Sequence, residues 1–297
     1  MDFFKYIHAV GTGPKGNRDL TLEESKDMME QILNKSIPNE QAAAFLLGWR
    51  LKPETAIEFR GAIEACESFI EKTTIANSLE LGYPFDGKAK NPYMFPLVAK
   101  VLEESGLSLV VVGDELTPSK GGITIKEICN NIELNTNAHY FDRKDFFPEM
   151  SELTELRMKL GLRSGFNTIE KLPGIANSEY AVTGVFHKPY VKKYIEIFSD
   201  RYKRFALIQG NEGTPELFSK GRLWITNGGD VDEIIVDPAY YGINYTKSWD
   251  TITLENSLSQ LNNPSDEYLK LAKLNAAVYL FITQNTASID EAWERLN

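Results

Sequence analysis

The side chains that most often carry chemistry in proteins are few and scattered in this sequence. The three histidines, His8, His139 and His187, are too far apart along the chain to suggest a metal site, and we expect each to be structural. Residues 11–18, GTGPKGNR, are glycine-rich and basic, a composition that can hold a phosphate. However, the segment precedes a helix and follows no strand, so it is not a P-loop. We interpret it as a flexible connector or a basic arm.

The two cysteines and the composition are typical of a globular protein with reduced thiols. Cys66 and Cys129 match no metal or redox spacing, so we expect reduced, structural thiols in a cytoplasmic protein. Of the 297 residues, 42% are hydrophobic and 25% are charged, which is typical of a globular protein. No long apolar run opens the chain, and the apolar stretch at residues 107–113 is too short to cross a bilayer. We therefore predict no membrane contact.

The net charge of −10 limits the kinds of partner that the protein can have. Binding to duplex nucleic acid needs clustered lysines and arginines that displace counterions from the phosphates. The acidic balance therefore disfavours a nucleic-acid protein that relies on bulk charge. It does not exclude a local basic groove on an acidic body.

The first 72 residues are predicted to form helices only. Thr21 with Glu24 three residues later is a capping-box pattern, and Pro38 and Pro53 mark the starts of two further helices. Residues 41–51 are apolar on nearly every side. Such a helix must be buried on most sides, inside its domain or against a partner subunit.

Beyond residue 72, the pattern predicts strands that alternate with helices, which is typical of a largely parallel sheet with crossover helices. The expected strands are residues 78–83, 107–112, 180–186 and 204–209, and the expected helices are 93–105, 123–131, 190–201, 266–283 and 289–296. The turn signal NGGD at residues 227–230 predicts a hairpin. We divide the chain into a helical domain, residues 1–72, and an α/β domain, residues 73–297. Polar helices near 144–160 could return to pack on the first domain.

Several segments resemble the anthranilate phosphoribosyltransferases (TrpD) of glycosyl transferase family 3. Residues 18–62 resemble the helical domain of that family, LRSGFNT and TGVFHKPY resemble its central motifs, and residues 273–293 resemble its C-terminal helices. The resemblance implies an α/β protein of the nucleoside phosphorylase/phosphoribosyltransferase type. In that architecture a small N-terminal helical domain mediates dimerisation, a larger α/β domain carries a mostly parallel central sheet, and the ligand binds in the cleft between them.

The motifs that bind phosphoribosyl pyrophosphate (PRPP) in that family are largely replaced. Active members carry Gly-Thr-Gly-Gly-Asp and Asn-x-Ser-Thr, in which glycines let backbone N–H groups approach the anion. The matching segment here is GYPFDGKAKNPYMF, residues 82–95. Gly82, Asp86 and Gly87 are kept, but Tyr-Pro-Phe follows Gly82, and Pro-Tyr-Met-Phe stands in place of the second motif. These replacements have almost no capacity to bind an anion.

The remaining family motifs are partly kept. A Lys-His-Gly-Asn-Arg motif reads VVGDE at residues 111–115, which would repel a polyphosphate. The following Ser-Lys-x-Gly motif is kept as Ser119, Lys120 and Gly122. The arginine that faces the aromatic acid in the family corresponds to Arg163, with Asn167 close by in the sequence.

The family's magnesium-binding Asp-Glu pair is half lost, because Pro215 stands before Glu216. Asp86 and Glu216 are therefore only weak metal candidates, since magnesium needs several oxygen ligands. We expect no cofactor, and magnesium only if transferase activity is retained.

The pattern of replacements is similar to a second, TrpD-like branch of the family. Its marks are a glycine-rich, basic N-terminal stretch, here GTGPKGNRDL, and a Tyr-Pro-x-x-Gly-Lys segment, here YPFDGKAKNP. The resemblance implies loss of the standard activity and a role in nucleic-acid binding.

We assign no catalytic residue and predict a ligand or phosphate site in the cleft. Its members are the glycines and polar residues kept or gained there, namely Gly82, Asp86, Gly87, Lys88, Lys90, Ser119, Lys120, Gly122, Arg163 and Asn167. Lys88 and Lys90 could instead be solvated loop charges, and Arg163 could be structural. Aromatic residues at positions 83, 93 and 95 could stack on bases, or belong to the core.

Two hypotheses follow for the function. In the first, a homodimeric protein binds single-stranded nucleic acid or a small phosphorylated, nucleotide-like ligand in the cleft. In the alternative, the protein is a glycosyl or phosphoribosyl transferase with an altered donor or acceptor. We favour the first because binding needs fewer intact groups than transfer does, and in neither do we expect anthranilate phosphoribosyl transfer.

Overall fold

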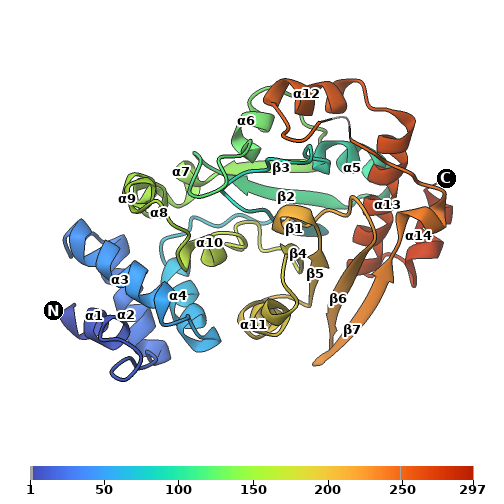
Figure 1. The fold of residues 1–297 in the computed structure, drawn as a ribbon. Coiled ribbons are helices and arrows are strands. Elements are labelled where there is room, and N and C mark those ends of the chain that lie inside the picture. Colours follow the sequence, from blue (N-terminus) through green and yellow to red (C-terminus); the bar gives the residue numbers. More distant parts are fainter. Residues whose placement is uncertain (1–2, 248, 297) are drawn as a thin grey trace.

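The N-terminal part of the protein is a helical bundle in the computed structural model, which describes residues 3–247 and 249–296. The bundle contains α1 (Phe4–Gly11), α2 (Leu22–Leu33), α3 (Asn39–Leu51) and α4 (Ala56–Glu67). Figure 1 shows these helices, in blue, grouped at one side of the molecule next to the α/β part.

Local sequence explains where two of these helices begin. The Thr21 hydroxyl accepts a hydrogen bond from the Glu24 amide at 3.1 Å, and the Glu24 carboxylate accepts one from the Thr21 amide at 3.0 Å. The predicted capping box is therefore present at α2, and Thr55 and Glu58 form a second one at α4. Each cap satisfies backbone donors that the first helical turn leaves unpaired and contributes about 1 kcal/mol.

A seven-stranded sheet forms the centre of the α/β part, in the order β3-β2-β1-β4-β5-β6-β7. Its parallel strands are β1 (Ser78–Gly82), β2 (Ser108–Gly113), β3 (Ala138–Asp142), β4 (Tyr180–Val185) and β5 (Arg204–Gln209). The predicted hairpin forms the antiparallel strands β6 (Gly221–Asn227) and β7 (Asp230–Val236). The expected fold class, a helical domain with a mostly parallel sheet, is confirmed. The strand β3 was not predicted; it is a short edge strand that is mostly half-buried.

The sheet separates two apolar cores because side chains alternate along each strand. Leu79 and Leu81 of β1 face the first core, which also contains residues of the helices on that side. These helices are α5 (Phe95–Val101), α6 (Ile125–Cys129), α12 (Leu254–Asn262), α13 (Asp266–Ile282) and α14 (Ile289–Arg295). Val110 and Val112 of β2 face the second core, which contains residues of α11 (Pro189–Phe198) and of the bundle. The second core therefore runs without a break from the sheet into the bundle.

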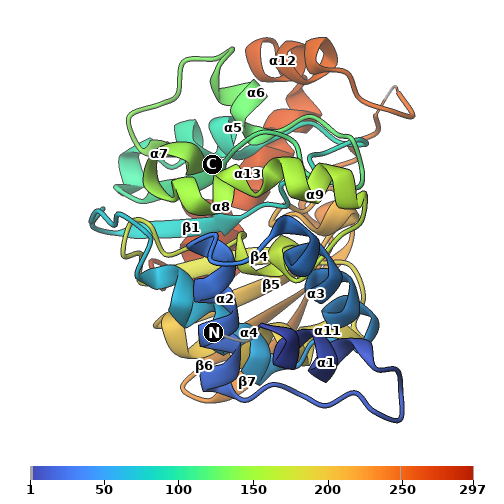
Figure 2. The ribbon, with the colours of Figure 1, turned by 90° about the vertical axis from the view of Figure 1, so that its left-hand side faces the viewer.

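Three short helices replace the single polar helical segment predicted near residues 144–160. They are α7 (Arg143–Phe146), α8 (Pro148–Glu152) and α9 (Thr154–Leu160). The break at Phe147 follows from Pro148, because a proline disfavours the helical conformation of the residue before it. Met150 and Leu156 belong to the core shared with the bundle, and Figure 2 shows α8 and α9 lying over the bundle. The domain boundary at residue 72 stays a prediction.

Trp49 packs between the bundle and helix α10 (Phe166–Ile169). Its ring is fully buried, and its indole N–H donates a hydrogen bond to Glu58 at 3.0 Å. A Cβ at Gly165, which precedes α10, would lie 2.5 Å from this ring, so a side chain cannot be placed there without a shift. Trp49 is therefore a packing residue between the two parts of the chain.

Short 3-10 helices complete the described elements. The 3-10 helices are η1 (Glu103–Ser105), η2 (Ser199–Arg201), η3 (Asn211–Gly213) and η4 (Pro238–Tyr241). Within residues 3–247 and 249–296, the helices are too short or too polar to cross a bilayer.

Glu80 of β1 is an acidic residue inside the second core. It accepts hydrogen bonds from the Tyr202 hydroxyl at 2.7 Å and from the Gly174 amide at 2.9 Å. Burial raises the pKa of Glu80, and these hydrogen bonds and the charges of Arg201 and Lys72 oppose the effect only in part. The folded protein therefore binds this proton more tightly than the unfolded chain does. The resulting stabilisation is present in acid and is lost as the pH rises through the folded pKa.

We predict that Glu80→Gln will raise the free energy of unfolding at neutral pH but not near pH 4. The amide keeps the shape of the side chain and has no charge to bury. Its oxygen can accept from the Gly174 amide, and its NH2 group can donate to the Tyr202 hydroxyl oxygen. Urea unfolding of both proteins at several pH values should show a difference that grows as the pH rises. A difference that is constant with pH would show that Glu80 does not take up a proton on folding.

Candidate functional site

The segment between β1 and α5, residues 83–94, lies at the carboxyl edge of the parallel strands. Ligands of open α/β sheets bind at this edge. The loop after β2 reaches the segment through a β-bridge between Lys88 and Ile123. The loop after β5 reaches it through the side chains of Glu212 and Glu216. These three loops form the candidate site.

Glycines allow these loops to approach one another closely. Gly87 has a φ of +74°, and a Cβ there would lie 2.5 Å from the backbone of Gly122. A Cβ at Gly122 would lie 2.5 Å from the backbone of Lys88, and one at Gly82 would lie 2.8 Å from Thr183. Close packing against backbone at Gly87 and Gly122, and against the Thr183 side chain at Gly82, therefore already explains these three glycines. Their role in holding a phosphate stays a prediction.

Lys88 is buried, so both interpretations drawn from the sequence, a cleft rim or a solvated loop charge, are wrong. Its side chain is 1% exposed and forms an ion pair with Glu216, which is fully buried. The ammonium also donates to the Pro92 carbonyl at 2.7 Å and lies over the ring of Phe218. The Glu216 charge compensates for the hydration that the ammonium loses on burial.

Glu216 is the centre of a buried polar cluster. In addition to Lys88, it accepts hydrogen bonds from the Tyr83 hydroxyl and from the Met94 amide, each at 2.6 Å. Burial and, after it, the charge of Glu216 raise the pKa of Tyr83, so the phenol keeps its proton and remains a donor. Both oxygens of the carboxylate are therefore engaged by groups of the chain itself.

The aromatic residues of the segment belong to the core. Tyr83, Tyr93 and Phe95 are each at most 1% exposed, and their ring centroids lie 5.3 to 6.4 Å apart. The Tyr93 hydroxyl donates to the Ile123 carbonyl at 2.8 Å. These rings cannot stack on bases unless the segment moves, so the core alternative holds.

A second glutamate of the loop after β5, Glu212, binds the middle of the segment. Its carboxylate accepts hydrogen bonds from three successive amides, those of Ala89 at 2.6 Å, Lys90 at 3.1 Å and Asn91 at 3.1 Å. Consecutive N–H groups that converge in this way form a nest, an arrangement that favours an anion. Glu212 was not predicted as a site residue, because no sequence motif marks a contact between residues 121 to 123 positions apart.

Asp86 joins two of the predicted cations at the surface of the site. The Arg163 Nε donates to Asp86 at 2.9 Å, and the Lys120 ammonium lies 3.4 Å from the other carboxylate oxygen. The Asp86 side chain is 1% exposed, whereas those of Lys120 and Arg163 are 21% and 43% exposed. Burial lowers the pKa of Lys120, and the charges of Asp86 and Glu212 oppose this effect. Lys120 and Arg163 thus share the Asp86 carboxylate, and the Glu212 charge also acts on Lys120.

The other predicted site residues lie around Asp86, Lys120 and Arg163. Asn167 accepts a hydrogen bond from the Ser164 amide at 3.0 Å and donates one to the Pro118 carbonyl at 3.3 Å, so it ties its own segment to the loop after β2. Lys90 and Ser119 are exposed. The surface of the site thus carries the predicted cations other than Lys88.

The two metal candidates do not fit a magnesium site. Asp86 faces Arg163 and Lys120, and Glu216 faces Lys88, so each carboxylate already has a cation beside it. Magnesium requires an octahedron of oxygen ligands. Across the part of the chain that the structure describes, no three side chains of His, Cys, Asp or Glu are gathered as metal ligands.

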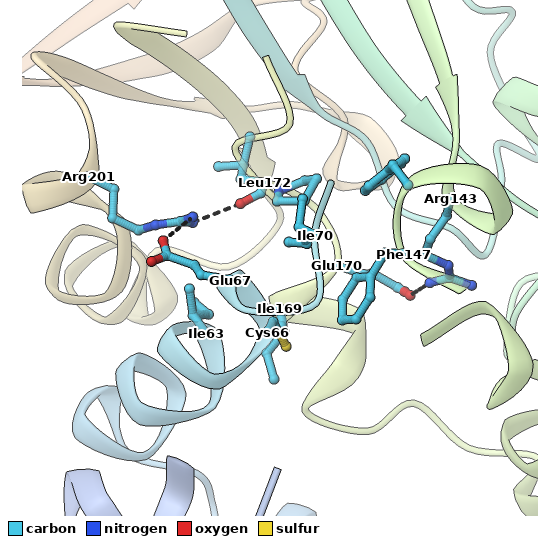
Figure 3. A pocket seen from close by; sticks show the side chains of 12 residues that line it. Ile63, Cys66, Glu67, Ile70, Arg143, Phe147, Ile169, Glu170, Leu172 and Arg201 are labelled. Carbon is cyan, nitrogen blue, oxygen red and sulfur yellow. Dashed lines mark hydrogen bonds and ion pairs between the residues drawn. The ribbon is translucent and has the colours of Figure 1, made fainter. Parts of the chain in front are cut away.

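A buried network of charges joins α7 and α9 to the loop after β2. Arg143 donates to Asp114 at 2.8 Å and binds Glu170, and Arg157 donates to Glu170 at 2.8 Å. Burial alone would raise the pKa of Asp114, but the Arg143 charge and the hydrogen bonds lower it overall. Asp114 was expected to repel a polyphosphate, and its charge is instead neutralised internally. Figure 3 shows Arg143 and Glu170 beside a cavity of about 10 Å³, which has room for about one water.

Comparison with known proteins shows what the bundle and the whole chain are similar to. Residues 5–69 match the glycosyl transferase family, helical bundle domain. The bundle is therefore similar to the helical domain of this family. An uncharacterized protein of Aquifex aeolicus is 27% identical, over 100% of this chain and 98% of that protein. The anthranilate phosphoribosyltransferase of Caldicellulosiruptor saccharolyticus is 27% identical, over 92% of this chain and 88% of the enzyme. The uncharacterized protein YbiB of Escherichia coli is 25% identical over 72% of each chain.

Solved structures show that the similarity extends beyond the helical bundle to the α/β part. The anthranilate phosphoribosyltransferase of Thermus thermophilus has a TM-score of 0.76 at 16% identity and covers 100% of this chain and 93% of its own. The Saccharomyces cerevisiae enzyme in complex with PRPP and Mg has a TM-score of 0.77 at 15% identity, over 99% of this chain and 92% of its own. The whole chain therefore has the anthranilate phosphoribosyltransferase fold, and the resemblance noted in the sequence is confirmed.

We predict that Lys88→Met will lower the free energy of unfolding by about 3 kcal/mol. Methionine fills a similar volume but leaves the Glu216 carboxylate buried without its counter-charge. Lys90→Met, two residues away and exposed, is the matched control and should change the free energy by less than about 0.5 kcal/mol. Urea unfolding followed by circular dichroism measures both.

The double variant Lys88→Met with Glu216→Gln separates the lost charge pair from lost packing. It removes both charges, while the amide oxygen can still accept from Tyr83 and Met94, so it should recover part of the lost stability. Equal stabilities of Lys88→Met and Lys90→Met would contradict the role of the ion pair in holding the segment.

Proposed function

We propose that this chain is a cytoplasmic protein that binds a phosphate-bearing ligand, single-stranded nucleic acid or a nucleotide, at the candidate site, and that it does not transfer phosphoribose to anthranilate. The ion pair between Lys88 and Glu216 carries the proposal. The yeast enzyme of this fold was solved in complex with PRPP and Mg. Here an ammonium of the chain itself faces Glu216, the carboxylate that matches the family's metal-binding pair, and it competes with magnesium for the same oxygens.

The cations at the surface of the site support an anionic ligand. Lys90 is exposed, and Lys120 and Arg163 share the single carboxylate of Asp86. An ammonium has three donors and a guanidinium has five, so both groups can bind a phosphate without releasing Asp86. These contacts recognise a phosphate and do not read base identity.

A neighbouring surface favours nucleic acid over a free nucleotide. The segment after β4 exposes the rings of Phe186 and Tyr190, to 60% and 50%, and carries the lysines Lys188, Lys192 and Lys193. Because β4 lies next to β1 in the sheet, this segment leaves the same edge as the candidate site. Exposed aromatic rings beside lysines suit a single strand, whose bases stack on the rings while its phosphates follow the charges.

We predict that a fluorescein-labelled single-stranded RNA will bind the wild type at low salt and dissociate steeply as salt rises, given the net charge of −10. Lys90→Glu combined with Lys120→Gln should weaken binding by roughly ten-fold or more, because two phosphate contacts are lost. Fluorescence anisotropy measures both proteins. Calorimetry with PRPP and magnesium should give no micromolar affinity.

Lys100→Glu combined with Lys144→Gln is the matched control, since it makes the same change in charge at two other exposed lysines. It should bind RNA as the wild type does. Failure of both RNA and ATP to bind at low salt would overturn the proposal. A micromolar dissociation constant for PRPP with magnesium would favour a transferase with an altered acceptor instead.

We also propose that two chains associate through the outer side of α3. This helix was predicted to be buried on most sides, but in the single chain Leu47 and Leu51 remain 37% and 73% exposed. Helix α9 packs on α3 and exposes Met158, and Leu162 just beyond it is also exposed. Apolar side chains exposed together in this way mark an interaction surface.

We predict that Leu51→Glu will convert a wild-type dimer to a monomer in light scattering at micromolar concentration. Because Leu51 is mostly exposed in the single chain, the circular dichroism spectrum should not change. Leu269→Glu, at a half-exposed leucine of α13, is the control and should leave the mass unchanged. A wild-type monomer at this concentration would contradict the proposed association.

A further inference from the structure

The Glu212 carboxylate lies where an external anion would bind. The amides of residues 89–91 converge on it at 2.6 to 3.1 Å. On the opposite side of this backbone, the Ile252 amide donates to the Ala89 carbonyl at 2.9 Å, and the Trp249 indole donates to the Lys90 carbonyl at 3.0 Å. The segment 249–252 therefore supports the nest, and the nest does not depend on Glu212 alone for its shape.

Glu212 is held in an unfavourable backbone conformation. Its φ of +70° and ψ of 5° lie in the left-handed region, which residues other than glycine rarely adopt. Strain of this kind persists only where surrounding contacts impose it, and it gathers at ligand sites and switches. Here the contacts of Glu212 include those of its carboxylate with the nest and that of its main-chain carbonyl with Lys120. The loop can relax when another anion supplies the same contacts.

Glu212 and Glu216 differ in how firmly they are held. Glu216 is fully buried and paired with Lys88. Glu212 is half-buried, its carboxylate binds backbone amides, and the Lys120 ammonium binds its main-chain carbonyl at 3.0 Å. Movement of Glu212 would thus uncover three amides and free one donor of Lys120 at the same point.

We propose that Glu212 is an internal competitor for the phosphate of the ligand, which displaces the carboxylate from the amides of residues 89–91 and binds Lys120. The inference rests on the proposed function of the site. A terminal phosphate, as on a nucleotide or at the end of a nucleic-acid strand, has three acceptor oxygens and more charge than a carboxylate, so it suits three amides and an ammonium better. The measured affinity for the ligand is reduced by the fraction of molecules in which Glu212 occupies the nest.

Inorganic phosphate is the probe, titrated into ¹⁵N-labelled protein while NMR follows the amide signals of residues 89–91. Glu212→Gly empties the nest and suits a left-handed backbone, so it should bind phosphate about ten-fold tighter than the wild type. Glu212→Gln keeps the shape of the side chain without its charge and should give a smaller gain. Glu133→Gln makes the same change in charge at an exposed position, and it should bind phosphate as the wild type does.

Equal phosphate affinities of the wild type, Glu212→Gly and Glu212→Gln, or shifts confined to other amides, would overturn the inference. The proposed function would stand in that case if RNA still bound. Tighter phosphate binding by Glu212→Gly at residues 89–91, with no RNA or ATP binding by either protein, would support the internal competitor and refute the proposed function. Circular dichroism checks that each variant is folded.

Discussion

The buried ion pair between Lys88 and Glu216 holds the candidate site in one shape. Neither charge can remain in the core without the other, because each would then lose its hydration without compensation. Tyr83, Met94 and Pro92 complete the hydrogen bonds of the pair, so the segment after β1 and the loop after β5 are fixed to each other. The more exposed contacts of the site, those of Glu212 and Asp86, are built on this frame.

Most of the fold was predictable because local patterns decide it. The Thr21 capping box, the alternation of strands with helices, and the hairpin turn at residues 227–230 each have a short-range physical cause. The edge strand β3 was missed because its half-buried residues give no continuous apolar run. The break between α7 and α8 at Phe147 follows from Pro148, a signal that is present in the sequence.

The site was predictable only in part. Replacement of the family motifs was visible in residues 82–95, but Lys88 and Lys90 look alike in the sequence, and one is inside the core while the other faces solvent. The difference depends on Glu216, which is 128 residues away along the chain. Glu212 was missed for the same reason, since its partners are main-chain amides that any sequence would provide. Such long-range polar contacts are decided by tertiary packing alone.

The packing of Trp49 against Gly165 restricts how the molecule can move. Turning the bundle as a rigid body against the sheet would move this ring away from Gly165. It would also open the apolar core that the bundle and the sheet share, which costs free energy. Hinge closure of one domain on the other is therefore a costly route to admit a ligand. Rearrangement of the loops at the strand ends disturbs far less buried surface, and such loops move within nanoseconds to microseconds. A ligand therefore reaches the candidate site by movement of the loops and not by movement of the domains.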